Sequence, residues 1–296
     1  CLFDSVRGAT KLLTTVGDVL ETTDADTLDS FASDGFQVDA DVKVNTSSEN
    51  YVAWCWKAGT TGSGTTTGSG TGKAYSYSVN TTSGFSIVKY AGNGTAAHTI
   101  PHHLGVAPDM VICKSITQNR GWPTQHTSLT DASYSVYLST TAAQSSGTNS
   151  WNSTAASSTV TTLGDNANNN RVDDNDEYIM YAFAEKQGFS KFGGYTGNGN
   201  VDGTFVYTGF KPAMVITKTY DSGAADWTIY DNKRDPFNVI TGQIQPNKSD
   251  AESTSTSVDF LSNGFKGRNV YRSANYSGSY IYMAFAEAPF VNSNGV

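Results

Sequence analysis

The chain has 296 residues, a formal net charge of -8 and a sequence pI near 4.9. Hydrophobic residues make up 38% of it and charged residues only 16%, which is typical of a β-rich globular protein with many polar turns. The acidic balance argues against nucleic acid as a partner, because phosphate backbones are bound by clustered Lys and Arg. The sequence has no run of about eighteen apolar residues, so we expect no membrane insertion.

Residues 1–59 are expected to be the second half of a repeat unit. Residues 2–7 and 30–36 match residues 229–234 and 259–265 in type and order. Such internal matches indicate structural units that recur along a chain. Since the sequence has no initiator Met, we expect a fragment of a longer protein in which the first half of this unit precedes it.

Residues 51–58, with the sequence YVAWCWKA, are predicted to form a central strand. The run recurs at residues 178–185 (YIMYAFAE) and 280–287 (YIYMAFAE). Apolar runs of this length, rich in β-branched and aromatic residues, are typical of strands covered on both faces. Cys55 lies in this pattern and Cys113 in a similar one, so we expect both to be small buried residues.

Residues 60–83 are predicted to be a flexible linker or a long loop. Gly, Ser and Thr dominate the first part of this stretch, a composition typical of flexible chain. The corresponding place in the next repeat, residues 186–187, has no insertion. We therefore expect that the segment is not needed for the fold.

Residues 84–186 and 187–290 are predicted to be two β modules, followed by a tail at residues 291–296. The two Gly-Phe-Ser starts, at Gly84 and Gly188, are 104 positions apart, which is about the length of one domain. Within each module, short alternating segments are separated by turn signals, as in antiparallel sandwiches. The predicted fold is all-β, with tandem antiparallel β-sandwich, jelly-roll-like modules.

Aromatic residues in polar surroundings are the candidate binding residues. Trp122, Trp151 and Tyr134 lie in stretches rich in Ser, Thr and Asn, and exposed aromatic rings form platforms for the faces of sugars. We take these three residues as the hypothetical glycan-binding site. The alternative, a buried position in the core, is equally open for Trp122 and Trp151, and it is the favoured interpretation of Trp227.

Two clusters raise the question of a metal ion. His98, His102 and His103 are close enough in sequence to suggest zinc, but the next repeat lacks histidines there, so we favour a surface loop. Residues 165–177 are rich in oxygen donors and suggest calcium. They align with plain turns in the other repeats, so we favour a turn. No metal site and no cofactor is expected.

The sequence offers no recognisable catalytic arrangement. Glu185 and Glu287 end the repeated apolar runs, and Asp231 lies in a polar stretch. A glycosidase requires two carboxylates held across a cleft, and the pattern indicates no such pair. Because the glutamates recur with the strand, a structural hydrogen bond is the favoured role, and the chain is not expected to be an enzyme.

Several motifs together resemble a repeated module of virion structural proteins from marine and cyanobacterial tailed phages. They are Gly-Phe-Ser followed by Tyr-x-Gly-Asn-Gly, the block Gly209–Lys218, Trp-x-Ile-Tyr-Asp-x-Lys-Arg, Phe-Leu-Ser-Asn-Gly-Phe and the Ala-Phe-Ala-Glu strand end. Residues 102–108 are also similar to the His-x-Leu-Gly-x-x-Pro turn of phage tail-fibre proteins. The resemblance implies a β-rich module in a tail fibre, tail spike or capsid appendage, and it carries over no catalytic motif.

From this resemblance we expect a phage virion protein, a fibre or surface appendage that contributes to attachment to host-surface glycans. The expected location is the virion, and the expected partners are other virion proteins and further copies of the chain, with a trimer favoured. Three alternatives stay open: a purely architectural capsid or tail decoration without glycan binding, a bacterial surface adhesin, and a polysaccharide depolymerase.

Overall fold

The computed structural model describes residues 1–147, 149–171 and 176–288. These ranges consist of antiparallel strands, turns and one short helix, α1 (Val42–Asn45), so the all-β prediction is confirmed. No helix within them is long and apolar enough to cross a membrane. The predicted tail at residues 291–296 lies outside the described residues.

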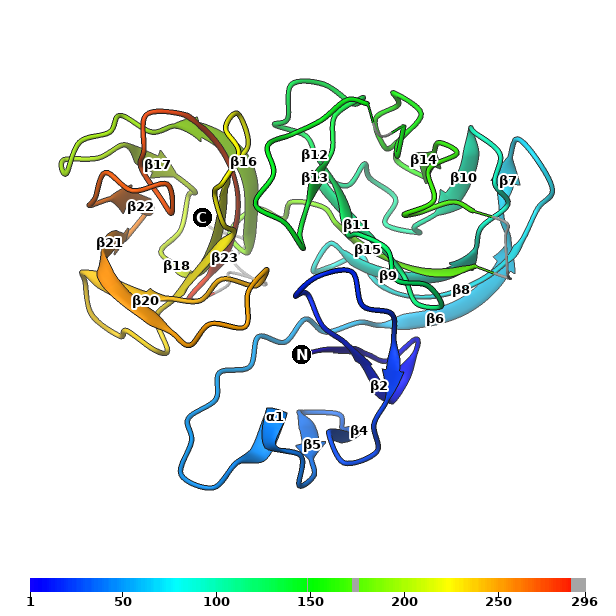
Figure 1. The fold of residues 1–296 in the computed structure, drawn as a ribbon, viewed down its shortest axis with the longest axis horizontal. Helices are drawn as coiled ribbons and strands as arrows, with labels where there is room; N and C mark the ends of the chain where they lie inside the picture. Colours follow the sequence, from blue (N-terminus) through cyan, green and yellow to red (C-terminus); the bar gives the residue numbers. More distant parts are fainter. Residues whose placement is uncertain (148, 172–175, 289–296) are drawn as a thin grey trace, which may run out of the picture.

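Three units surround a common centre. Figure 1 shows them as three lobes, which we call unit 1 (residues 1–59), unit 2 (residues 60–186) and unit 3 (residues 187–288). Units 2 and 3 are complete sandwiches, whereas unit 1 is the small lobe around the N-terminus. The predicted repeat therefore appears as separate structural units joined at one place.

Unit 3 is a sandwich of two four-stranded antiparallel sheets. The strand orders are β16-β23-β18-β19 and β17-β22-β21-β20, and eight strands in two sheets agree with the predicted jelly-roll-like sandwich. The strands are β16 (Ser190–Thr196), β17 (Phe205–Tyr207), β18 (Pro212–Thr219), β19 (Thr228–Asp231), β20 (Ile240–Gln243), β21 (Ser253–Leu261), β22 (Gly264–Gly267) and β23 (Ser279–Ala286).

Unit 2 repeats this plan and extends one sheet. Its sheets have the orders β13-β12-β11-β15-β9-β8-β6 and β14-β10-β7, and the central strand β15 corresponds to β23. The strands are β6 (Thr60–Thr65), β7 (Thr67–Gly68), β8 (Ala74–Asn80), β9 (Phe85–Ala91), β10 (His98–Pro101), β11 (Met110–Ser115), β12 (Pro123–His126), β13 (Val136–Tyr137), β14 (Val160–Leu163) and β15 (Glu177–Phe183).

The prediction of a linker at residues 60–83 is wrong. Strand β6 pairs with β8, and β8 pairs with β9, so the segment forms the edge of the seven-stranded sheet. Gly62 lies opposite Tyr77 and Gly64 opposite Tyr75. A Cβ atom on either glycine would come within 2.7 Å of the hydroxyl oxygen of the opposite tyrosine and within 2.9 Å of its ring. The glycines are therefore strand positions covered by aromatic rings, an arrangement that stabilises glycine in an edge strand.

Unit 1 has two small sheets and no sandwich. A three-stranded sheet contains β1 (Leu2–Asp4), β2 (Gly8–Leu13) and β3 (Thr22–Thr23), and a hairpin contains β4 (Leu28–Phe31) and β5 (Phe36–Val38). Residues 51–58 alternate between exposed and partly buried positions but belong to no sheet, so the prediction of a third central strand is wrong. A strand needs neighbours for its backbone groups, and the described part of unit 1 lacks counterparts of the strands that flank β23.

The common core joins the three units. The bulky faces of residues 51–58, β15 and β23 all point into it, and Trp56 packs edge-on against Phe183 at 6.0 Å and Phe285 at 5.3 Å. Units 2 and 3 each have, in addition, a private core between their own two sheets. Among the described residues, unit 1 has no such private core.

Candidate functional site

The predicted glycan platform is wrong for both tryptophans. Trp122 and Trp151 are fully buried, with 0% of each residue exposed, and Tyr134 is half-buried against the common core. Trp122 precedes β12 as Trp227 precedes the equivalent strand β19, so both rings fill the same core position. The sequence indicates this equivalence through spacing, because Trp122 and Trp227 are 105 residues apart, close to the repeat length.

The histidines do not form a metal site. His98 hydrogen-bonds to Thr66 and Asn170, and His102 hydrogen-bonds to the Ser157 carbonyl. His103 stacks on a tyrosine ring, so the three side chains have different partners. His98 and His102 are buried rather than on a surface loop. The described residues contain no group of three or more His, Cys, Asp or Glu that could hold a metal ion.

Within its described residues, the candidate calcium stretch contributes a buried amide. Asn170 is fully buried and uses its amide as both a donor and an acceptor to backbone groups. Part of the stretch, residues 172–175, lies outside the described residues. The stretch thus holds backbone segments together, which agrees with the favoured interpretation as a turn.

The candidate carboxylates take part in ion pairs with nearby basic side chains. Glu185 pairs with Lys191 at 2.7 Å, and its counterpart Glu287 pairs with Lys211 at 2.8 Å. Asp231 pairs with Arg234 at 2.7 Å within a tight turn. These contacts match the structural role that the recurrence of the glutamates indicates.

One turn recurs in all three units, and in units 1 and 2 its polar side chain contacts the next unit. Asp4, His126 and Asp231 are the last residues of β1, β12 and β19, and each accepts a hydrogen bond from the backbone N–H two residues later. Asp4 and Asp231 are each followed, three residues on, by an arginine that donates back to the carboxylate. The predicted match between residues 2–7 and 229–234 is therefore a match in hydrogen bonding as well as in sequence.

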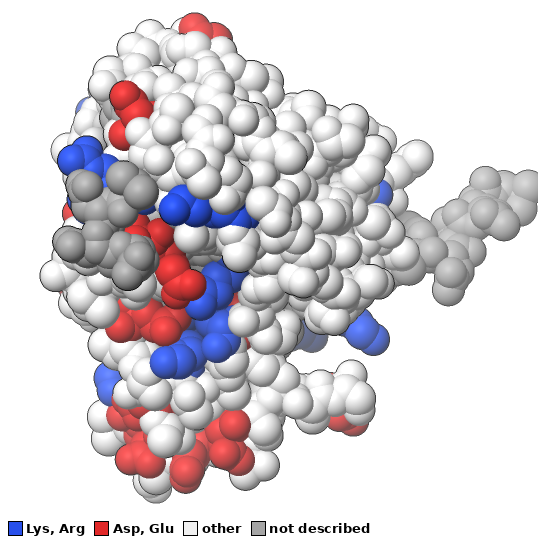
Figure 2. Space-filling model, turned by 90° about the vertical axis from the view of Figure 1, so that its right-hand side faces the viewer, with Lys and Arg blue, Asp and Glu red and all other residues white. Residues whose placement is uncertain are grey.

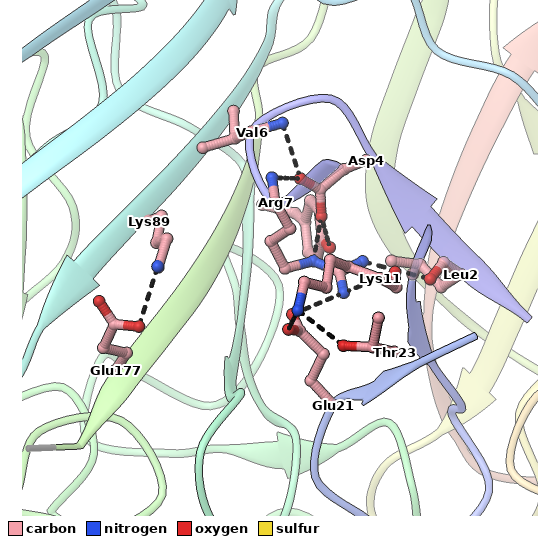
Figure 3. A network of polar contacts seen from close by, with 10 residues as sticks. Leu2, Asp4, Val6, Arg7, Lys11, Glu21, Thr23, Lys89 and Glu177 are labelled. Atoms are coloured by element: carbon pink, nitrogen blue, oxygen red, sulfur yellow. Dashed lines mark hydrogen bonds and ion pairs between the residues drawn. The ribbon is translucent and has the colours of Figure 1, made fainter. Parts of the chain in front are cut away.

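Asp4 connects unit 1 to unit 2 through a buried polar network, shown in Figure 3. Its carboxylate accepts from Arg7 within unit 1 and from the Tyr181 hydroxyl of unit 2 at 2.6 Å. Arg7 also donates to Glu21 at 3.1 Å and to two backbone carbonyls. Burial, followed by the nearby Asp4 charge, raises the pKa of Tyr181 well above its usual value, so the phenol stays a donor.

Buried lysines form a second connection between consecutive units. Lys114 of unit 2 and Lys218 of unit 3 occupy equivalent positions and are almost fully buried. Each ammonium donates to a carbonyl of its own unit and to a carbonyl of the preceding unit, Asp18 or Thr141, at 3.1 Å in both cases. Burial lowers the pKa of both lysines to about 8.

A backbone hydrogen bond accompanies each lysine contact. Three residues after the accepting carbonyl, the N–H of Glu21 donates to Ile116, and the N–H of Gln144 donates to Tyr220, at 3.1 and 2.8 Å. Unit 1 therefore contacts unit 2 in the same way as unit 2 contacts unit 3.

Each unit also has a corner built from an Asn and the Tyr that starts the central segment. The Asn amide donates to the carbonyl six residues earlier, at 2.9, 2.6 and 3.0 Å in units 1, 2 and 3. The N–H after the Asn donates to the Tyr hydroxyl, at 2.9, 3.1 and 2.8 Å. The Asn–Tyr corners are Asn45 with Tyr51, Asn170 with Tyr178, and Asn275 with Tyr280.

The first half of the unit closes this corner in units 2 and 3. The corner Asn Oδ1 accepts from the backbone N–H of Asn93 or Asn198, at 2.9 and 3.1 Å. The corner Tyr stacks on Tyr90 or Tyr195, with ring centroids 5.4 and 4.7 Å apart. Both contacts come from the Gly-Phe-Ser strand and the Gly-Asn-Gly turn that follows it.

Unit 1 has the same corner with an open face. Tyr51 is 48% exposed, Phe31 44% and Phe36 42%, whereas their counterparts in unit 3 are at most 3% exposed. Cys55 is also exposed, so its predicted burial is wrong, although the counterparts Ala182 and Ala284 are fully buried. We call Phe31, Phe36, Tyr51 and Cys55 the open face, and it is the candidate functional site of the chain.

The fold and this site define a class of protein, an all-β repeat protein whose units share one core and whose first unit has an open face. A family model for a domain of unknown function, DUF7483, matches residues 1–289, and the chain belongs to that family. No curated protein and no solved structure is similar to the chain.

Tyr181→Phe should loosen unit 1 from unit 2. The substitution removes one donor to the buried Asp4 carboxylate and leaves the ring in place, so we expect a loss of about 1.5–3 kcal/mol in the free energy of unfolding. Tyr207→Phe, at a residue 63% exposed, is the matched control and should be neutral. Urea denaturation measures both variants, and equal stability of the two would contradict the role of the network.

Acid should weaken the junction between units 2 and 3. His126 accepts from the Ser128 N–H through Nδ1 and so donates to the Tyr282 carbonyl through Nε2. Burial lowers its pKa to about 4. The unfolded chain, with a histidine pKa near 6.5, binds the proton more readily, so stability is full above that pH and falls by up to about 3 kcal/mol as the pH approaches 4.

His126→Gln tests this assignment, because the amide can keep both hydrogen bonds without titrating. Unfolding free energies at pH 7.5 and 4.5 should differ less in the variant than in the parent. His98 and His102 also have lowered pKa values through burial, so a smaller acid dependence should persist. The same pH dependence in both proteins would contradict the prediction.

Proposed function

We propose that the chain is a structural protein of a tailed-phage particle, located in a fibre or surface appendage, and that its main role is architectural. The observation that carries this proposal is the equivalence of the two junctions, in which buried lysines, turns and backbone bonds fix consecutive units around one core. Such contacts keep units in a fixed relation, which suits a load-bearing or spacing element. The assignment to a phage particle rests on the resemblance of the sequence motifs to modules of phage virion proteins.

The assignment of the charged residues agrees with this role. Glu185 and Glu287 pair with lysines at the ends of equivalent strands, and Asp231 holds a turn. These side chains are used by the fold itself, so we propose no enzymatic activity. Assembly into a homo-oligomer, with a trimer favoured, and contact with other virion proteins belong to the same proposal.

Phage particles whose genome encodes this sequence should contain the protein. We expect its peptides in mass spectra of particles washed in high salt, and we expect gold-labelled antibodies against the chain to mark a fibre or appendage in electron micrographs. Peptides present in the cell lysate but absent from washed particles would overturn the proposal. An adhesin would instead appear on uninfected cells.

Glycan attachment is a second candidate function, at a different place from the buried tryptophans. Phe205 and Tyr207 are 44% and 63% exposed, and residues two apart on a strand point to the same face. They lie on β17, an edge strand of unit 3. Two exposed rings side by side could contact the face of a sugar.

Replacing Phe205 and Tyr207 together with Ala tests this candidate. We expect the melting temperature to change little, because both rings are largely in solvent, while binding on a glycan array and adsorption to cells should be lost. The matched control is Phe237→Ala, at a residue 82% exposed elsewhere in unit 3. Unchanged binding in the double variant would leave only the architectural role.

A further inference from the structure

We propose that unit 1 binds a chain segment with the first-half pattern of this repeat, a three-stranded segment that completes its sandwich and closes the junction to unit 3. The pattern is the Gly-Phe-Ser strand, the Gly-Asn-Gly turn and the Met-Val-Ile-x-Lys strand. The inference rests on the comparison of the open unit with the two complete ones. It does not depend on the virion assignment.

The backbone of residues 51–58 provides the two edges that such a segment would use. In unit 3, the equivalent strand β23 pairs with β16 on one edge and with β18 on the other. Unit 2 has the same arrangement, with β15 between β9 and β11. Within the described residues, residues 51–58 lie in no sheet, so neither of their edges has a strand partner, although the Lys57 carbonyl accepts from the Asn80 amide.

The open face provides the apolar surface that the segment would cover. Phe31 and Phe36 correspond to Phe260 and Phe265 in the private core of unit 3. In unit 1, Phe31 is 44% exposed and Phe36 is 42% exposed, whereas the counterparts are buried. Covering four such side chains supplies the hydrophobic driving force for association.

The Asn–Tyr corner provides specificity for this segment. Asn45 and Tyr51 already make the two internal contacts of the corner. Among the described residues, Asn45 Oδ1 accepts no hydrogen bond, and Asn45 is exposed, whereas the corner Asn of units 2 and 3 is fully buried. A Gly-Asn-Gly turn would donate to this oxygen, and the Tyr of the preceding strand would stack on Tyr51.

Charge favours the same occupant. Unit 1 has ten acidic and four basic residues, so it carries six of the eight net negative charges of the chain. Figure 2 shows acidic side chains gathered over its lower end. The two first halves in this chain, residues 84–115 and 188–219, carry net charges of +1 and +2. A first-half segment is therefore complementary to unit 1 in charge.

The surface of unit 3 next to unit 1 also favours a first-half segment. The loop of unit 3 that corresponds to the lysine-binding stretch of units 1 and 2 lies between β20 and β21, and residues 248–252 of this loop are all exposed. In units 2 and 3, the last first-half strand supplies the buried lysine of each junction. The lysine at the end of the Met-Val-Ile-x-Lys strand would make the third contact of this type.

A second copy of the chain is a weaker candidate. In each copy, the first-half strands β9 and β16 are already hydrogen-bonded to β15 and β23 along seven residue pairs each. A second copy could place one of these strands on unit 1 only by opening one of its own complete units. An additional first-half segment avoids that cost, and the test separates the two occupants.

The experiment places residues 188–227 directly before the full chain. Trp227 precedes Thr228, the counterpart of Cys1, so this junction continues the register of unit 3 into unit 1. Cys1→Thr in both proteins leaves Cys55 as the exposed thiol, because Cys113 is buried. We expect alkylation of Cys55 in the fusion to be slower by roughly 100-fold or more than in the parent, since a buried thiol reacts only through local opening.

Two controls keep the test decisive. Shuffling the order of the added residues should leave Cys55 as reactive as in the parent, whereas residues 84–122, the first half of unit 2, should protect it. Full reactivity with both native segments would overturn the proposal. Protection in the monomeric parent, or protection that rises with parent concentration as light scattering reports an oligomer, would also overturn it.

Discussion

Burial of three equivalent apolar faces against one another is the constraint on which the structure depends. A strand with one bulky and one small face must cover both, and here the bulky faces of residues 51–58, β15 and β23 meet in the common core. Their opposite faces then need separate layers, which the second sheets of units 2 and 3 supply. The repeat therefore specifies both the sandwich and the way in which the sandwiches join.

The junctions show how a repeated backbone carries different chemistry. Asp4 and His126 occupy equivalent turns, and each accepts a hydrogen bond from the equivalent backbone N–H. In the neighbouring unit, however, Asp4 accepts from a phenol hydroxyl, whereas His126 donates to a carbonyl. A carboxylate only accepts hydrogen bonds, whereas a neutral imidazole can accept at one nitrogen and donate at the other. The residue in each turn thus follows from what the neighbouring unit presents.

The sequence predicted the fold class well and the strand pairing less well. Short alternating segments separated by turn signals identified the all-β class, because that pattern is local. Residues 51–58 failed as a strand since a sheet requires partners that the pattern of the segment itself does not contain. The Gly-rich stretch at residues 60–83 failed because the covering rings of Tyr75 and Tyr77 lie across the sheet. Trp122 is buried in the core although its neighbours in sequence are polar. Its spacing to Trp227 indicates this position better than the polarity of its neighbours does.

Unit 1 depends on unit 2 in a way that the other two units do not depend on each other. It has no private core among the described residues, and a buried network of Asp4, Arg7 and Tyr181 joins it to its neighbour. Buried ion pairs often add little net stability, but they penalise any arrangement that leaves a charge unpaired. The network therefore fixes the position of unit 1 more than it strengthens the unit. A half unit held in register in this way presents its open face in the geometry that a completing segment requires.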